Sequence, residues 1–225
     1  MRLPPGQLRI DDFPRFGLGG RPPALPAEHE IEISGVLDDP VAVAVSELAT
    51  MPRRAVSADF HCVSGWTATG LQWEGVAFAD LYDAVVRPRL PAGRAVTHVV
   101  LEGLDGYRSV AWLEDLLDHD VLVADRLDDR PLGVDHGAPA RLVSPAQYGY
   151  ISTKHLARIE LHSSEPRVRY HPSRRSNLRL QLVKPHPRAR VWHEERHRYL
   201  PGRLLRPVYH RLIKLVRTRN AATAR

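Results

Sequence analysis

Short runs of apolar residues, separated by glycine and proline, constrain the fold of this chain more than any other feature. Residues 29–36 and 155–161 alternate polar and apolar side chains, as strands with one buried face do. Residues 76–86 place apolar side chains at helical spacing, and Pro88 follows as a stop. Strands are predicted at 29–36, 54–63, 96–102, 107–112, 120–125, 139–143 and 155–161. Because these runs lack a regular βαβ rhythm, we predict an α+β domain built on mixed β-sheet.

Charge divides the chain into an acidic body and a basic extension. Residues 166–225 hold 17 of the 32 Lys and Arg residues but only two of the 26 Asp and Glu residues. Proline and glycine are frequent in residues 1–28, which favours an extended arm. We therefore expect three parts: the arm at 1–28, a domain at 29–165 and a basic C-terminal extension at 166–225. Within the extension, residues 204–216 have the pattern of a basic amphipathic helix.

The single cysteine and the lack of long apolar stretches bear on the cellular setting. Cys62 has no second cysteine with which to form an internal disulfide. No stretch approaches the ~20 apolar residues that span a bilayer, and the N-terminal residues lack the apolar core of a secretory signal. We expect a cytoplasmic protein, with peripheral contact at the inner membrane face as a further option for the basic extension.

Cys62 lies in the segment DFHCVSGW, and its neighbours favour a ligand role. A lone cysteine is most often a small buried hydrophobe. Here His61 offers a polar group that favours the thiolate over the thiol, and Gly65 indicates a tight turn. Trp66 and Trp73 are expected to supply apolar walls. A thiolate in such a setting selects soft or redox-active metals.

A second candidate segment, residues 136–154, combines cationic and hydroxyl side chains with glycine and proline. Guanidinium groups fork onto oxygen atoms, and ammonium groups act as point charges. Hydroxyls and backbone N–H groups can complete a phosphate cradle. The segment is compatible with an anion-binding site. The alternative is a loop and a strand whose charged side chains are simply solvated. The candidate residues are His136, Arg141, Ser152, Thr153 and Lys154.

Taken together, DFHCVSGWTATGLQWEGV (59–76) and DHGAPARLVSPAQYGYISTKHLARIEL (135–161) resemble the catalytic domain of the sulfite oxidase family of molybdopterin enzymes. That family includes bacterial members that reduce methionine sulfoxide. Both segments occur in the family's order and at a similar separation, and the resemblance covers roughly residues 8–165. It implies an oxidoreductase with the family's mixed-sheet domain and a molybdenum–molybdopterin cofactor.

The resemblance also implies roles for individual residues. Cys62 matches the cysteine whose thiolate ligates molybdenum. His136 and Arg141 match positions that contact the pterin and its phosphate. The other implied cofactor contacts are Arg15 in the N-terminal arm, His61, Gly103 through its backbone, and the phosphate-binding run Ser152, Thr153 and Lys154.

One departure from the family bears on the substrate. Sulfite oxidases proper have a tyrosine beside the metal, and Asp125 aligns at that point. An anionic side chain there would repel sulfite. We therefore predict two-electron oxygen-atom transfer on a small S- or N-oxide type of substrate. Asp125 and Tyr107 are expected to act with Cys62 in catalysis. Arg108 and Tyr148 are expected to line the same pocket.

Residues 193–197, HEERH, match the H-E-x-x-H pattern of zinc hydrolases. On a helix, His193 and His197 would share one face, with Glu194 as the base. The segment is highly polar and the sequence offers no evident third ligand. A solvated basic helix with internal Glu–Arg pairs is therefore the preferred interpretation.

The expected partners are a small-molecule substrate and an unidentified electron donor or acceptor, which a membrane could carry. The basic extension is expected to wrap the acidic body, with an anionic membrane as the second choice. It lacks a recognised nucleic-acid motif, so nucleic acid is disfavoured. The alternative to an enzyme is a non-catalytic binding protein of the same fold that uses this extension. The oligomeric state stays open.

Overall fold

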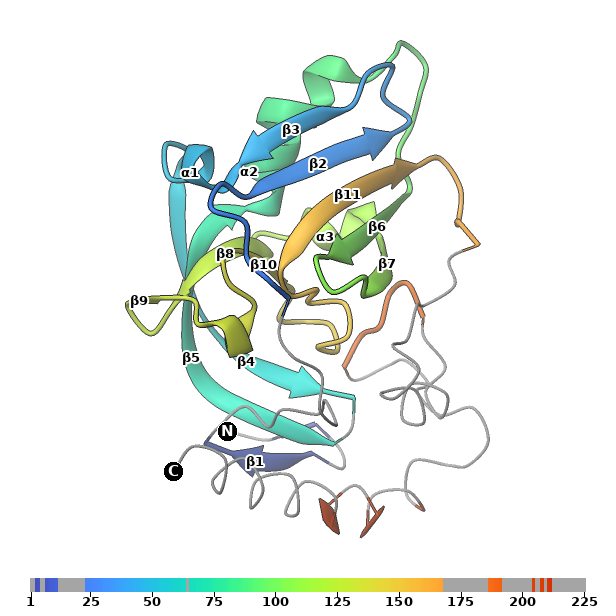
Figure 1. Ribbon diagram of the computed structural model, residues 1–225. Coiled ribbons are helices and arrows are strands. Elements are labelled where there is room, and N and C mark those ends of the chain that lie inside the picture. The colour runs from blue at the N-terminus through green and yellow to red at the C-terminus, as the bar shows by residue number, and fades with distance from the viewer. Residues whose placement is uncertain are drawn as a thin grey trace.

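The chain folds into two β-sheets with few and short helices, as Figure 1 shows. The structure is a computed structural model. It describes residues 3–4, 7–11, 23–63, 65–167, 186–191, 204, 207–208 and 210–211. Both sheets combine parallel and antiparallel pairs, so the predicted α+β class with mixed sheet is confirmed.

The five-stranded sheet contains the segments with the clearest alternation. Its strands in spatial order are β3 (Val41–Ala44), β2 (Glu30–Gly35), β11 (Leu156–His162), β6 (His98–Gly103) and β7 (Arg108–Trp112). Strand β11 pairs parallel with β2 and antiparallel with β6. Ile31, Ile33 and Ile159 are buried on the inner face, while Glu32 and Arg158 form an ion pair at 3.2 Å on the other. The period of two along each strand produces this division.

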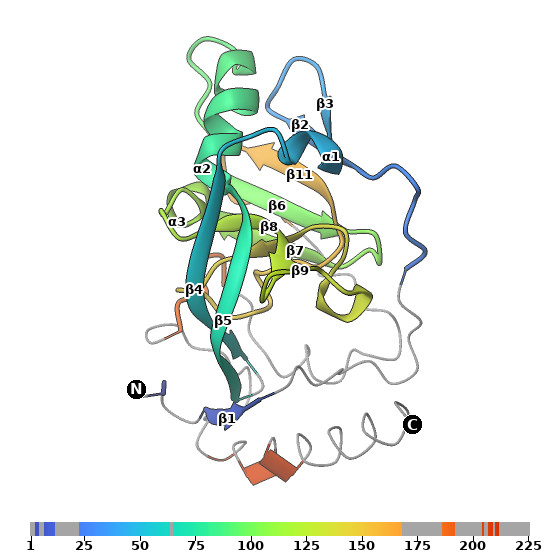
Figure 2. The same cartoon turned by 90° about the vertical axis from the view of Figure 1, so that its left-hand side faces the viewer.

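The six-stranded sheet is organised around one long hairpin. Its strands are β1 (Leu8–Ile10), β4 (Arg53–Cys62), β5 (Trp66–Ala77), β8 (Leu122–Leu127), β9 (Arg130–Pro131) and β10 (Arg141–Val143). Strands β4 and β5 pair from Arg53 opposite Val76 to Cys62 opposite Trp66. Figures 1 and 2 show this hairpin running away from the other strands towards β1, which pairs parallel with β5. Cys62 therefore lies at the tip of the hairpin, next to the residues of β5 that pair with β1.

The helices are short and connect the strands. They are α1 (Val45–Leu48), α2 (Phe78–Leu81), a π-helical turn at Tyr82–Val86, a 3-10 turn at Arg87–Arg89, α3 (Leu113–Leu116) and a 3-10 turn at Val134–His136. The helix predicted at 76–86 is largely correct, but Pro88 lies inside the following turn and not beyond it. In the described part of the chain, no helix has both the length and the apolar character needed to cross a bilayer.

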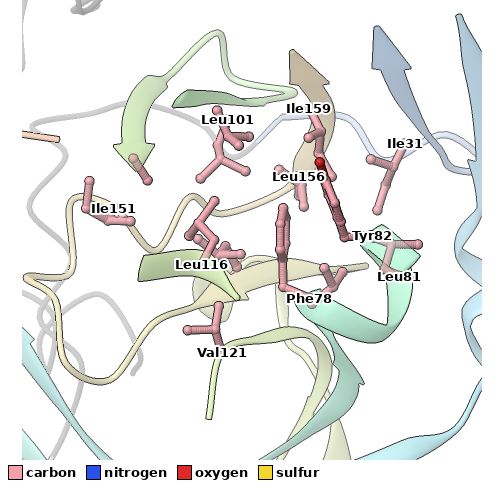
Figure 3. Packing of buried hydrophobic residues seen from close by; sticks show 14 of the residues in the cluster. Ile31, Phe78, Leu81, Tyr82, Leu101, Leu116, Val121, Ile151, Leu156 and Ile159 are labelled. Carbon is pink, nitrogen blue, oxygen red and sulfur yellow. The ribbon is translucent and has the colours of Figure 1, made fainter. Parts of the chain in front are cut away.

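The main core lies between α2 and the inner face of the five-stranded sheet. Figure 3 shows Phe78 of α2 and Tyr82 of the following π-helical turn pointing towards Leu156 and Ile159 of β11, in one buried cluster with Leu116 of α3. Burying an apolar side chain of this size stabilises a fold by about 1.5–3 kcal/mol. A second apolar cluster surrounds the hairpin and includes Phe60, Trp66 and Trp73. The candidate site is built on this second cluster.

Strand β5 depends on a close backbone approach at Gly75. A Cβ atom at this position would overlap the carbonyl oxygen of Val123 and lie 2.6 Å from the Cα atom of Ala124. We expect Gly75→Ala to lower the free energy of unfolding by about 1–3 kcal/mol, because β5 and β8 must move apart. Urea denaturation measures this change. Gly133→Ala is the matched control, since its nearest neighbour is 3.9 Å away, and equal effects of the two variants would contradict the prediction.

Candidate functional site

Cys62 ends β4 and opens the tight turn to β5. The N–H group of Gly65 donates to the carbonyl oxygen of Cys62 at 3.0 Å, and Gly65 has a φ of +92°, which favours glycine. The side-chain amide of Gln7 donates to the same carbonyl at 3.2 Å. The thiol is only partly buried and packs at the edge of the second apolar cluster. Two hydrogen bonds thus fix the backbone of this half-buried cysteine.

His61, also expected at the site, points to the opposite face of β4 from Cys62 because side chains alternate along a strand. Its Nδ1 atom lies 2.9 Å from the hydroxyl of Thr67, and that hydroxyl donates to the side-chain oxygen of Gln7 at 3.3 Å. Nδ1 is therefore the donor to Thr67 in this arrangement. Gln7 links the histidine to the Cys62 carbonyl, a role that no pattern in the sequence indicated.

The loop at 144–151 lies against the hairpin tip. The N–H group of Gly149 donates to the carbonyl oxygen of His61 at 2.8 Å, and a Cβ atom at Gly149 would overlap the ring of Phe60. The hydroxyl of Tyr107 donates to the carbonyl oxygen of Tyr150 at 2.6 Å. Tyr107 thereby contacts the loop that binds the main chain of His61, with its hydroxyl directed at a main-chain carbonyl; its expected part in catalysis stays a prediction.

The two ends of the predicted anion segment come together. The N–H group of His155 donates to the carbonyl oxygen of Gly137 at 3.1 Å. A Cβ atom at Gly137, which has a φ of +102°, would lie 3.0 Å from the side chain of Lys154. The ammonium group of Lys154 donates to the carbonyl oxygen of Asp135. The residues on either side of His136 are therefore in direct contact with Lys154.

Arg141 joins this surface to the hairpin and is fully buried. Its guanidinium group donates to the carbonyl oxygens of Leu142 at 3.2 Å, His136 at 3.0 Å and Ser152 at 2.8 Å. It also lies 5.1 Å from the ring centre of Phe60 and 5.2 Å from that of Trp73. Burial lowers the pKa of the Arg141 guanidinium to about 9, so the group stays cationic at neutral pH.

The two hydroxyls of the predicted phosphate-binding run are directed into the protein. The hydroxyl of Ser152 accepts a hydrogen bond from the N–H group of Ser144 at 3.2 Å. That of Thr153 lies 2.9 Å from the hydroxyl of Ser109, and both side chains are buried. Of the run from Ser152 to Lys154, only Lys154 combines a charge with partial exposure.

Gly103 supports the same run from the other sheet. A Cβ atom at Gly103 would overlap the carbonyl oxygen of Lys154 and lie 2.8 Å from the carboxylate of Asp105. That carboxylate accepts a hydrogen bond from the N–H group of Tyr107 at 3.1 Å. Gly103 was expected to contact the cofactor through its backbone, and the structure shows it packed against the backbone of Lys154. Asp105 is a neighbour of the site that the sequence did not single out.

The prediction that Asp125 lies beside Cys62 is wrong. Asp125 forms a bidentate ion pair with Arg53, at 2.6 Å and 2.9 Å, at the opposite end of the hairpin. The register of β5 places its neighbour Glu74 eight positions from Trp66, which is about 25 Å at the rise of an extended strand. An alignment of short segments does not give the register between strands. The distance between Asp125 and Cys62 could therefore not be predicted from the sequence.

Two further residues expected at the pocket have structural roles instead. Arg108 forms ion pairs with Glu102 at 3.2 Å and Glu160 at 2.6 Å on the outer face of the five-stranded sheet. Tyr148 is fully buried, and its hydroxyl donates to the carbonyl oxygen of Val191. The walls expected from Trp66 and Trp73 are also core contacts, since Trp66 stacks on Phe60 at 5.7 Å.

Several predictions lie outside the described residues. Arg15 and the HEERH segment at 193–197 are among them, as is most of the helix predicted at 204–216. Within the described residues, no three side chains of His, Cys, Asp or Glu gather in a way that could hold a metal ion.

His155 predicts how the stability of this site depends on pH. Its Nδ1 atom lies 2.6 Å from the carbonyl oxygen of Ala138, and burial lowers the pKa of the imidazole. The unfolded chain therefore binds this proton more readily, so the free energy of unfolding should fall as the pH drops below about 6.5. His155→Asn should reduce this slope, since Asn tolerates the φ of +53° at this position.

Urea denaturation of both proteins at pH 7.5, 6.5 and 5.5 measures the slope. The difference between wild type and variant isolates His155 from the other histidines. Parallel curves over this range would show that the imidazole does not contribute to the pH dependence.

Comparison with known proteins identifies the family and supports the fold. The sequence profile described as Oxidoreductase molybdopterin binding domain matches residues 19–170. The uncharacterized oxidoreductase YuiH of Bacillus subtilis is 28% identical over 160 residues, which cover 71% of this chain and 78% of YuiH. The methionine-sulfoxide reductase catalytic subunit MsrP of Gluconobacter oxydans is 27% identical over 181 residues, covering 69% of this chain and 56% of MsrP.

Among solved structures, the sulfane dehydrogenase SoxCD of Paracoccus pantotrophus superposes with a TM-score of 0.52 at 19% identity. The match covers 60% of this chain and 38% of the SoxCD chain, and it supports the fold. The chain thus spans little more than half of MsrP and less than half of SoxCD.

The profile covers most of the sheets described above, including Cys62, Arg141 and Lys154, and the resemblance to sulfite-oxidase-like domains is confirmed. The chain belongs to the family of oxidoreductase molybdopterin binding domains.

Proposed function

We propose that this oxidoreductase reduces small S- or N-oxides by two-electron oxygen-atom transfer, with Cys62 as the protein ligand of molybdenum. One observation carries the proposal. The partly exposed thiol of Cys62 lies at the hairpin tip, and the buried Arg141 connects that tip to the loops that hold His136 and Lys154. A soft ligand and a cationic surface are therefore parts of one structure.

The residues fit a molybdenum–pterin group that bears a phosphate. A thiolate is a suitable ligand for molybdenum, and an ammonium group at the surface can bind a phosphate as a point charge. The side-chain hydrogen bonds of Arg141 go to main-chain carbonyls, so its positive charge adds to that of Lys154. Gly137 lies close to the side chain of Lys154, and Gly149 lies close to the ring of Phe60, so the backbone comes near both the cation and the hairpin tip.

When bound, the molybdenum–pterin group supplies the two-electron chemistry. The substrate loses its oxygen atom as water and takes up two electrons and two protons, and a separate donor supplies the electrons. Cys62 holds the metal at a fixed position because Gln7 and Gly65 restrain its carbonyl. Lys154 binds the phosphate. Arg141 holds the main chain around both groups in place.

The proposed substrate class is supported by the similarity to MsrP and can be tested by assay. MsrP is named as a protein-methionine-sulfoxide reductase, which supports an S-oxide. Asp125 lies far from Cys62 and no longer argues against sulfite. Reduction of methionine sulfoxide and trimethylamine N-oxide with a reduced viologen dye should therefore be compared with oxidation of sulfite by ferricyanide. Turnover of sulfite alone would overturn the proposed reaction.

Cys62→Ser tests the metal ligand. We expect turnover to fall by more than about 100-fold, which is the upper end of the cost of changing a residue outside the ligand shell. Pterin content should be retained, because the phosphate contact of Lys154 is unchanged. Plasma mass spectrometry for molybdenum and fluorescence of the released, oxidised pterin measure both quantities. Wild-type turnover in this variant would exclude Cys62 as the ligand.

Lys154→Gln tests the phosphate contact. Loss of a charge-assisted hydrogen bond costs about 1.5–3 kcal/mol, so we expect cofactor affinity to fall by roughly tenfold or more. Cofactor affinity should also fall less steeply with rising salt concentration in the variant than in the wild type, because the variant has one charge fewer at the phosphate. Arg130→Gln makes the same charge change on the exposed strand β9 and is the control. Equal pterin retention by both variants would show that Lys154 does not bind the phosphate.

A further inference from the structure

Residues 186–191 lie outside the part of the chain that matches the family, yet they pack against the loop at 144–151. The N–H group of Tyr148 donates to the carbonyl oxygen of Ala189 at 2.9 Å, and that of Val191 donates to Ala146 at 3.1 Å. Ala189 and Val191 are almost completely buried. This segment, called the strap here, therefore extends the site loop in the manner of an added strand.

Side chains reinforce the contact at both ends of the strap. The amide of Gln147 donates to the carbonyl oxygens of Arg188 at 2.5 Å and Pro187 at 3.4 Å. The N–H group of His186 donates to the hydroxyl of Tyr150 at 3.2 Å. Four successive loop residues, 147–150, are consequently held either by the strap or, at Gly149, by the hairpin tip.

A buried carboxylate anchors the strap to the body. Asp115 of α3 is only 5% exposed, and its side chain lies 2.6 Å from the guanidinium of Arg190 and 3.6 Å from that of Arg188. The Arg188 guanidinium also lies 4.2 Å above the ring centre of Trp112. A carboxylate at such depth requires compensating charge, and two strap residues provide it. Removal of the negative charge takes this ion pair from Arg190, while Arg188 keeps its ion pair with Glu114 at 3.5 Å.

We propose that the strap is a positioning element of the cofactor site and that Asp115 is its anchor. The proposal rests on the function proposed above, because the loop that the strap holds is the one that borders Cys62. Gly149 donates to the carbonyl of His61 on the hairpin side, and Tyr148 donates to the strap on the other side. The loop is thus fixed between two partners, and release of one partner loosens its contact with the other.

Asp115→Asn in the full-length holoenzyme tests the anchor. Hydrogen exchange followed by mass spectrometry should show amide exchange in peptides covering 144–151 accelerated by about tenfold or more, with the peptide covering 98–103 unchanged. Cofactor release on dilution should accelerate, and the electron paramagnetic resonance signal of the singly reduced molybdenum should broaden, because the loop next to the metal is less ordered.

Asp83→Asn is the matched control, since Asp83 forms an ion pair with Arg87 at the same distance, 2.6 Å, but with its side chain 57% exposed. Arg190→Gln should reproduce the effect of Asp115→Asn, and Arg190→Lys should restore most of the protection. Should Asp115→Asn fail to fold, this pair of Arg190 variants gives the same comparison.

The outcomes separate the two proposals. Wild-type protein without molybdenum would refute the proposed function, and exchange at 144–151 would still decide whether the strap positions the loop. Molybdenum in the wild type, with unchanged exchange at 144–151 in Asp115→Asn and in Arg190→Gln, overturns the strap. Faster exchange with unaltered cofactor release and resonance signal also overturns it, because the loop would then be held without consequence for the site.

Discussion

The site depends on one buried cation. The Arg141 guanidinium lies between the rings of Phe60 and Trp73 and donates to three main-chain carbonyls, two of which belong to His136 and Ser152. Removing such a charge from water costs several kcal/mol, and charge-assisted hydrogen bonds return about 1.5–3 kcal/mol each. The balance is favourable only while all partners stay in place. Arg141 therefore couples the hairpin to the loops that form the cationic surface.

This coupling also bears on the position of the proposed catalytic cysteine, at the tip of the long β4–β5 hairpin. A projecting tip has few neighbours and would ordinarily be mobile. Here Phe60 stacks on Trp66 and faces Arg141, so the last residues of β4 share the core around the hairpin. Cys62 gains a fixed backbone from this core and keeps a partly exposed sulfur atom. A metal ligand needs both properties, because position and access are required at once.

The sequence predicted local structure better than relations between distant segments. Alternation identified β2 and β11, and the segment at 136–154 was identified as a whole as a candidate anion site. Strand β5 was missed, because Gly70 and Gly75 interrupt it and its two faces are buried unevenly. Asp125 was misplaced because strand register decides its distance from Cys62, and register is a property of the sheet. Arg141 was expected to contact the pterin and its phosphate, whereas its buried guanidinium donates to main-chain carbonyls, and the sequence around an arginine does not show whether its side chain is buried.

Segments on either side of the family match bind the main chain around Cys62 and the loop at 144–151. A motif within the match does not show these contacts. Gln7 precedes the matched residues and binds the carbonyl of Cys62, while the strap at 186–191 follows them and holds the loop at 144–151. Gln7 and the strap bind mainly main-chain atoms of the site. Their own side chains therefore form no sequence motif that would indicate catalysis. The domain supplies the thiol and the cations, and the flanking segments determine how rigidly these groups are held. Two chains with the same motifs can therefore differ in cofactor retention through residues that no motif contains.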